Sequence, residues 1–203
     1  MGVIGKAFYR GDDVVGITRQ LVGKFLFTYI DGELCGGYIT EAEAYAGIDD
    51  KASHAYGGRR TSRTEVMYAG GGVAYIYLCY GVHSMFNIVT NERDIPDAIL
   101  IRALFPVTGM AVMEKRMGCA GTPMKLTDGP GKVTKALGIH YSMSGIDLTD
   151  DAMTGDGPRI WLEDRGLQIN DNSIIRTARV GVNYAGEDAG RLYRFVMKNE
   201  TRR

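Results

Sequence analysis

The chain begins with a helical pattern of hydrophobic residues. Ile17, Leu21 and Phe25 recur every four residues, and Asp12 or Asp13 can cap the start of the helix. A helix is therefore predicted from this cap to about Phe25, with one apolar stripe facing the core.

A β-hairpin is predicted directly after this helix. Residues 25–30 and 34–45 have the composition of strands, and the dipeptide Asp31-Gly32 between them is typical of a tight hairpin turn. Side chains alternate between the two faces of a strand, so one face should carry a run of four: Ile39, Glu41, Glu43 and Tyr45. A carboxylate on this face is either exposed to solvent or kept for a functional role. The alternation alone does not show which of the two glutamates has such a role.

A long loop and three strands are predicted in the middle of the chain. Residues 46–72 lack a hydrophobic period, which is typical of a functional loop. Residues 73–80 and 82–90 form the next hairpin, which turns at Tyr80-Gly81, and residues 98–105 form a third strand.

The second half of the chain is predicted to mix helices and strands. Residues 108–117 are expected to be helical, and a second helix opens at Gly129-Pro130-Gly131-Lys132, because proline is favoured in the first turn. The remaining elements are strands at 159–162, 177–182 and 192–197 and an acidic loop at 147–157. Without a repeat or a clear linker, the pattern predicts one α+β domain over residues 1–203 with an antiparallel sheet.

Composition limits the class of protein. Of the 203 residues, 45% are hydrophobic and 24% are charged, as in a globular protein with a single core. The three cysteines, Cys35, Cys79 and Cys119, are odd in number and widely spaced, which indicates neither a disulfide framework nor a zinc site. With no apolar run of signal-peptide or membrane-spanning length, a cytoplasmic protein is expected.

The formal net charge is zero, but the charges are segregated. Residues 51–63 contain four basic and no acidic residues, and residues 102–135 contain six basic and two acidic ones. Residues 142–175 reverse this balance, with seven acidic and two basic residues. One basic face is compatible with a phosphate backbone, although such segregation is also common on solvated surfaces.

Tyrosines are dense around the second hairpin. Tyr75, Tyr77 and Tyr80 fall within six residues. Tyr75 and Tyr77 share one strand face, and core packing is the expectation for Tyr75. Tyr80 stands at the predicted turn, where an exposed ring is suited to stacking on a base or filling a gap in a duplex.

Three polar residues complete the candidate chemistry. His54 lies in the basic loop, and Asn87 and Arg102 interrupt apolar strands. Taken singly, each is explained by a structural hydrogen bond. Together with Glu43 and the tyrosines, they supply a proton acceptor, aromatic rings for stacking, a polar group that can contact the edge of a bound ring, and a cation.

Nine blocks of the sequence, in order, resemble the alkyladenine (3-methyladenine) DNA glycosylases of the mammalian type, a family that includes bacterial members of this length. The resemblance runs from about residue 18 to residue 196. The blocks are residues 39–45 (ITEAEAY), 52–54 (ASH), 57–61 (GGRRT), 74–81 (AYIYLCYG), 85–88 (MFNI), 100–104 (LIRAL), 129–132 (GPGK), 178–182 (ARVGV) and 192–195 (LYRF). The resemblance implies a curved antiparallel β-sheet with surrounding helices and a protruding β-hairpin.

The resemblance also implies roles for single residues. Glu43 stands where the family keeps the general base that activates water. Arg102 stands where an arginine positions that water and the nearby phosphate. The backbone carbonyl of Val180 is a further candidate contact for the water.

The remaining roles concern the damaged base. Tyr45, Tyr77 and His54 match the rings that sandwich a flipped base. Asn87 matches the residue that clashes with the exocyclic amine of normal guanine, and Tyr80 matches the wedge that fills the vacated stack.

The implied function is a monofunctional glycosylase of base excision repair. It would flip alkylated, deaminated or etheno purines out of double-stranded DNA and hydrolyse the N-glycosidic bond. No lysine lies beside Glu43 or in the aromatic strand, so no imine with the sugar is expected, and the product is an abasic site in an intact strand. Neither cofactor nor metal is expected, and the protein should be a monomer in the bacterial cytosol or nucleoid.

Three departures from the family pattern concern substrate preference and salt dependence rather than the reaction. His83 stands where relatives often have an aromatic residue, and the loop at 147–157 is specific to this lineage. The near-neutral charge is also lower than that of more basic relatives.

Three alternatives stay open from the residues alone. The first is a non-catalytic protein that binds damaged DNA on the same scaffold. The second is a metal-dependent hydrolase, and the third is a small-molecule enzyme or interaction module. The metal site of such a hydrolase would consist of Glu41, Glu43, Asp49, Asp50 and His54, whose spacing is poor for a ligand set.

Overall fold

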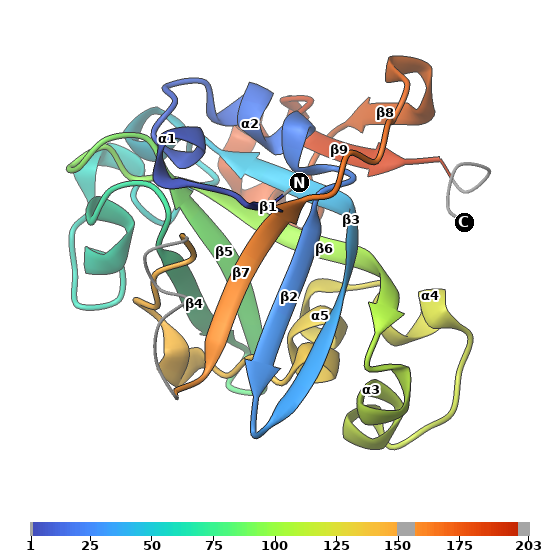
Figure 1. Ribbon diagram of the computed structural model, residues 1–203. Coiled ribbons are helices and arrows are strands. Elements are labelled where there is room, and N and C mark those ends of the chain that lie inside the picture. Colours follow the sequence, from blue (N-terminus) through green and yellow to red (C-terminus); the bar gives the residue numbers. More distant parts are fainter. Residues whose placement is uncertain (1, 150–156, 199–203) are drawn as a thin grey trace.

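The computed structural model describes residues 2–149 and 157–198, and its framework is one open antiparallel sheet (Figure 1). The strands follow one another across the sheet in the order β1 (Gly2–Val3), β7 (Arg159–Asp164), β2 (Phe25–Ile30), β3 (Glu33–Tyr45), β6 (Asp97–Thr108), β5 (His83–Thr90) and β4 (Ala74–Cys79). Strand β9 (Arg194–Met197) pairs with the second half of β3 and with β8 (Ile174–Thr177). The predicted α+β class with an antiparallel sheet is confirmed.

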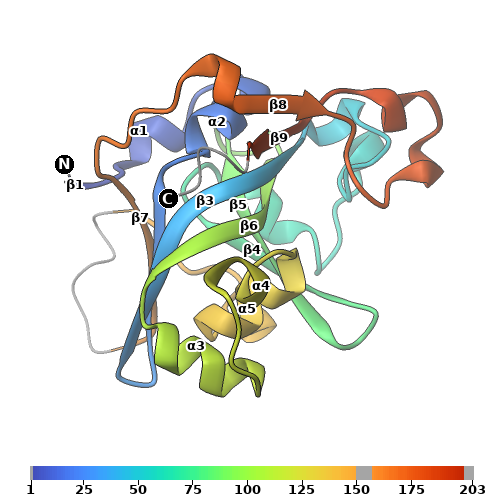
Figure 2. The same ribbon diagram turned by 90° about the vertical axis from the view of Figure 1, so that its right-hand side faces the viewer.

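In the described part of the chain, five α-helices surround the sheet: α1 (Lys6–Tyr9), α2 (Val14–Leu21), α3 (Met110–Met117), α4 (Pro123–Leu126) and α5 (Pro130–Leu137). Figure 2 shows α3, α4 and α5 grouped together below β3 and β6. The connections among residues 2–149 and 157–198 contain short 3₁₀ segments at Gly47–Asp49, Tyr56–Gly58, Glu65–Tyr68, Tyr141–Met143, Asp171–Ser173 and Asn183–Gly190. Within the described residues, no helix is long and apolar enough to cross a membrane.

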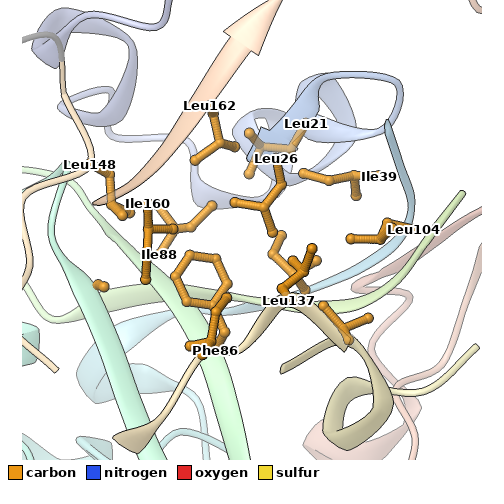
Figure 3. Close-up of a cluster of buried hydrophobic side chains, with 14 of the residues drawn as sticks. Leu21, Leu26, Ile39, Phe86, Ile88, Leu104, Leu137, Leu148, Ile160 and Leu162 are labelled. Atoms are coloured by element: carbon orange, nitrogen blue, oxygen red, sulfur yellow. The ribbon is translucent and has the colours of Figure 1, made fainter. Parts of the chain in front are cut away.

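The main core lies on one face of the sheet. Leu21 of α2 and Leu137 of α5 pack there with Phe86 and Ile88 of β5, and all four side chains are fully buried (Figure 3). Burying one such side chain contributes about 1.5–3 kcal/mol. The alternate residues of the same strands point away from this core, which leaves the opposite face of the sheet free to carry polar and aromatic groups.

Cross-strand register aligns the candidate residues on that opposite face. Glu43 of β3 pairs with Leu100 of β6, Leu100 pairs with Asn87 of β5, and Asn87 pairs with Tyr75 of β4. Directly paired residues in neighbouring strands share a face. Four strands therefore bring a carboxylate, an amide and a phenol into one row.

Strand β3 changes its alternation near Thr40. Its pairing with β6 shifts by one residue between Ile39 and Glu41 and shifts back between Glu41 and Ala42, so that Thr40 and Arg102 have no paired residue in this ladder. As a result Ile39 packs in the main core with Ala42, whereas Glu41 and Glu43 face the other side. The prediction that Ile39 shares a face with the glutamates is wrong, because a β-bulge reverses the alternation at that point.

Two other sequence predictions need correction at their ends. Helix α2 ends at Leu21 rather than near Phe25, because Gly23 adopts a φ of +91° and the chain turns into β2. Strand β6 continues to Thr108, so the helix predicted from that residue begins at Met110. Most of the predicted acidic loop, residues 150–156, lies outside the described residues.

The strand predicted at residues 177–182 is also wrong. Strand β8 ends at Thr177, and the next five residues form an irregular segment. Here the backbone N–H of Val180 donates to the Glu43 carboxylate instead of to a neighbouring strand. The side chain of Arg179 is buried, and Gly181 has a φ of +76°, which is incompatible with a regular strand.

Glycine at position 37 allows β3 and β6 to approach closely. A Cβ added to Gly37 would lie 2.1 Å from the backbone oxygen of Phe105, so alanine at this position should force the ladder apart. We expect Gly37→Ala to lower the free energy of unfolding by about 1–3 kcal/mol or more in denaturant titrations. Gly190→Ala is the control, because nothing lies within 4 Å of its added Cβ. Equal stability of the two variants would contradict this account.

Candidate active site

Glu43 is a fully buried charged group at the centre of the candidate site. Its side chain has no solvent exposure. Oε1 accepts a hydrogen bond from the Val180 backbone N–H at 2.8 Å, and Oε2 accepts from the Tyr45 hydroxyl at 2.9 Å and from Arg102 Nη1 at 3.3 Å. These donors fix the orientation of the carboxylate.

Burial raises the pKa of Glu43 above its ordinary value. Arg102, the Val180 N–H and the Tyr45 hydroxyl each lower that pKa, and nearby Glu41 raises it slightly. Desolvation is the largest cause, since the site removes the carboxylate from water. A carboxylate with a raised pKa is a stronger base and is well suited to accept a proton.

Glu41 has a different environment, although it lies on the same side of the sheet. Its Oε1 accepts from the Nε atoms of both Arg102 and Arg194, each at 2.7 Å. Burial alone would raise the pKa of Glu41, but the two arginines outweigh it and lower the pKa. The two arginines thus favour the ionised form of Glu41, which anchors Arg102, and the structure separates the two glutamates where the alternation does not.

An aromatic pocket lies next to the Glu43 carboxylate. Its wall includes Tyr45, His54, Tyr75, Tyr77, Asn87 and Tyr184. Tyr45 links the two features, because its ring lines the pocket while its hydroxyl donates to Glu43. A flat aromatic group between these rings would therefore lie beside the buried carboxylate.

His54 is held in the wall by its two ring nitrogens. Nδ1 lies 2.9 Å from the Tyr75 hydroxyl, and Nε2 lies 3.5 Å from Nη2 of Arg63. The imidazole also meets Tyr77 edge-on, with ring centroids 4.7 Å apart. Burial, followed by the positive charges of Arg63 and Arg59, lowers the pKa of His54 to about 4, so the ring is neutral at physiological pH.

Asn87 is fixed by the backbone of the second hairpin. Its Nδ2 donates to the carbonyl oxygens of Tyr75 and Met85, both at 3.1 Å. These two bonds occupy both amide hydrogens and leave Oδ1 as the acceptor of this pocket-lining side chain. A rigid acceptor of this kind can discriminate between groups on the edge of a bound base.

Tyr80 lies apart from the pocket, at the tip of the hairpin that joins β4 and β5. Its side chain is 94% exposed, and its φ of +51° is unusual for a residue other than glycine. Figure 2 shows this hairpin projecting beyond the body of the molecule. Tyr80 is therefore placed to contact a partner rather than to support the fold.

The sequence singled out most of these residues but missed several of their neighbours. The pocket also uses the hydroxyl of Tyr75, a residue expected only in the core, and Tyr184, which no sequence pattern marked. The missed Arg179 lies in the block at 178–182, where its guanidinium pairs with Asp50 and stacks 4.9 Å from the Tyr45 ring centroid. Arg194, which anchors Glu41, also went unnoticed.

The five residues of the metal-site alternative do not form one ligand set. Asp50 faces Arg179, Glu41 faces two arginines, and His54 faces the aromatic rings. Across residues 2–149 and 157–198, no three His, Cys, Asp or Glu side chains are grouped so as to hold a metal ion.

The site thus combines a fully buried carboxylate with an adjacent aromatic pocket. Comparison with known proteins gives the family. Residues 7–201 match the family model described as methylpurine-DNA glycosylase (MPG), and the chain belongs to that family. Its members are hydrolases that act on N-glycosyl bonds in DNA.

Individual relatives agree with this family. The chain is 39% identical to a Chlamydia felis protein over 96% of both chains, and 40% identical to a Chlamydia pneumoniae protein over 95% of this chain and 94% of the relative. A Desulfitobacterium hafniense protein is 38% identical over 97% of this chain and 95% of its own length. All three carry the name "Putative 3-methyladenine DNA glycosylase".

Proposed function

We propose that this chain is a monofunctional 3-methyladenine-type DNA glycosylase that acts on damaged purines in double-stranded DNA. The observation that carries the proposal is the Glu43 carboxylate, which is fully buried, held by three donors and adjacent to an aromatic pocket. A buried anion is costly to maintain, so a fold that keeps one beside an open pocket has a use for it.

In this proposal Glu43 activates the attacking water. Departure of the purine leaves oxocarbenium character on the sugar, which the carboxylate stabilises while it accepts a proton from water. Arg102 Nη1 lies 3.3 Å from Oε2 of Glu43 and is anchored by Glu41, which suits it to position the water and the nearby phosphate.

The pocket would receive the purine after it leaves the helix. Tyr45 lies on one side of the ring, and Tyr77 with His54 on the other. The C1′–N bond cannot be reached inside a duplex, so the nucleotide has to rotate out, at a cost of a few kcal/mol. Neutral His54 adds no positive charge of its own, and the side chain of Asn87, held in place by the hairpin backbone, would clash with the exocyclic amine of guanine.

The product would be an abasic site in an intact strand. Within the described residues, no lysine lines the pocket or contacts Glu43, so no amine is placed to form an imine with the sugar. We further propose that residues 1–203 act as one domain and as a monomer, since one flipped base needs one pocket.

A base-release assay tests this function directly. Duplexes carrying 3-methyladenine, 7-methylguanine, hypoxanthine or ethenoadenine are incubated with the protein, and free base and strand length are measured separately. We expect free base with an intact strand that breaks only after alkali treatment. Binding without base release would favour the non-catalytic alternative, and direct strand cleavage would contradict the monofunctional mechanism.

Tyr80 should matter for duplex substrates but not for folding. We expect Tyr80→Ala to leave thermal unfolding unchanged, because the ring is 94% exposed. Stacking of a base on an aromatic ring contributes about 1–3 kcal/mol, so excision from a duplex should fall by roughly 5-fold to 150-fold. The same lesion in a single strand is the control, because no stack has to be filled. Equal losses on both substrates would contradict the wedge role.

A further inference from the structure

Arg63 contacts two aromatic rings of the pocket. Its guanidinium carbon lies 4.9 Å from the centroid of the Tyr77 ring, and its Nη2 lies 3.5 Å from His54 Nε2. Burial raises the pKa of Tyr75, and the positive charge of Arg63 opposes that rise. One exposed side chain thus contacts both the histidine and Tyr77, and its charge acts on Tyr75.

The guanidinium does not form part of the wall of the aromatic pocket. Tyr77 and His54 both line the aromatic pocket, whereas Arg63 does not. Arg63 instead lines two neighbouring hollows, one shared with His54 and one shared with Tyr77. A base bound in the pocket would therefore have an aromatic ring between itself and the Arg63 cation.

The charge of Arg63 is not balanced by a carboxylate in the described part of the chain. Two other cations near the pocket do have carboxylate partners: Arg102 pairs with Glu41 and Glu43, and Arg179 pairs with Asp50. Arg59, which also lowers the pKa of His54, has no carboxylate partner among the described residues. In the same loop as Arg63, Arg60 pairs with Glu65 and Asp94. Arg63 is thus a source of net positive potential at this wall of the pocket.

A cation behind a ring weakens the attraction of the opposite face for a second cation. The face of an aromatic ring attracts positive charge through its quadrupole, and the charge of Arg63 already acts on that quadrupole. The low pKa of His54 is consistent with a positive potential at this wall of the pocket. Burial is the largest cause of the lowering, and the positive charges of Arg63 and Arg59 lower this pKa further. A positively charged purine would meet the same repulsion as a protonated His54.

Alkylation at N7 or N3 makes a purine cationic, whereas deamination and etheno-bridge formation leave it neutral. We infer that Arg63 is a specificity-determining residue that biases the pocket towards neutral damaged purines over cationic alkylated ones. The inference rests on the proposed function, because it concerns the substrate of the same pocket.

The test compares two substitutions of Arg63 on two lesions. Arg63→Met removes the charge but keeps an unbranched side chain over Tyr77, and Arg63→Lys keeps the charge without the planar group. Single-turnover rates of base release are measured on matched duplexes with 7-methylguanine or hypoxanthine. For Arg63→Met we expect the ratio of the 7-methylguanine rate to the hypoxanthine rate to rise about fivefold, the factor equivalent to about 1 kcal/mol of cation–π energy. Arg63→Lys should stay near the wild-type ratio.

A second measurement tests the electrostatic effect of Arg63 on His54 directly. The pKa of His54, measured by NMR titration, should rise in Arg63→Met and change less in Arg63→Lys. An unchanged ratio in Arg63→Met would overturn the inference. So would an equal loss on both lesions, which would make Arg63 a contact to the DNA backbone instead. Absence of base release by the unmodified protein on every lesion would instead refute the proposed function.

Discussion

Glu43→Gln should reduce excision of ethenoadenine or hypoxanthine from duplex DNA by roughly 10²–10⁴-fold, the range that a general base contributes. Glutamine has nearly the same shape and can still accept from Val180 N–H through its carbonyl oxygen, but it cannot take a proton from water. Single-turnover base release is the appropriate measurement, because it separates the chemical step from product release. Normal excision by this variant would refute the role of Glu43.

The matched control is Glu41→Gln, two residues away on the same face. Glu41 anchors Arg102 and Arg194 and does not touch the pocket wall. Its loss should lower stability and affect excision only through the position of Arg102, so most activity should remain. A deeper loss of excision in Glu41→Gln than in Glu43→Gln would reverse the assignment.

The raised pKa of Glu43 also predicts how the stability of Glu43→Gln and the activity of the unmodified enzyme change with pH. Because the folded-state pKa is raised, the folded state binds the proton more tightly than the unfolded chain. The stability associated with that proton is present at low pH and is lost as the pH rises through the folded-state pKa. Glu43→Gln should therefore unfold at the same or a higher temperature at neutral pH, while excision by the unmodified enzyme falls as acid protonates Glu43.

The sequence predicted the positions of the strands better than it predicted which side chains share a face of the sheet. Alternation correctly placed Glu41 with Glu43 and Tyr75 with Tyr77, because period two holds wherever the ladder is regular. It failed at Ile39, since a single unpaired residue at Thr40 reverses the faces. The hydrophobic pattern of β3 carries no signal for such a bulge, which depends on the fit to β6.

Residues 178–182 show a second limit of sequence patterns. The apolar and β-branched character of this segment predicts a strand, but its polar groups find partners that are distant in sequence. Val180 N–H donates to Glu43, and Arg179 pairs with Asp50 on the segment that follows β3. Local propensity cannot anticipate a segment whose conformation is determined by tertiary hydrogen bonds. The family resemblance marked this block as important without indicating its conformation.

Asp50→Ala should destabilise the protein by about 3–5 kcal/mol, the usual effect of leaving one member of a buried ion pair without its partner. The side chains of Asp50 and Arg179 are both fully buried, and two hydrogen bonds join them. Arg179 also donates to the carbonyl oxygens of Ala44 and Asp188, so it ties the end of β3 to two loops. Chemical denaturation measures the loss. Glu65→Ala, which breaks an exposed pair with Arg60, is the control and should cost no more than about 1 kcal/mol.

The double variant Asp50→Leu with Arg179→Met separates stability from function. Removing both charges eliminates the uncompensated cation, so much of the stability lost in Asp50→Ala should return. Excision should remain impaired, because Arg179 stacks on Tyr45 and directly precedes the residue whose N–H orients Glu43. Recovery of both stability and excision would show that the pair only supports the fold. Recovery of stability alone would show that Arg179 also positions the ring and the carboxylate that the proposed reaction uses.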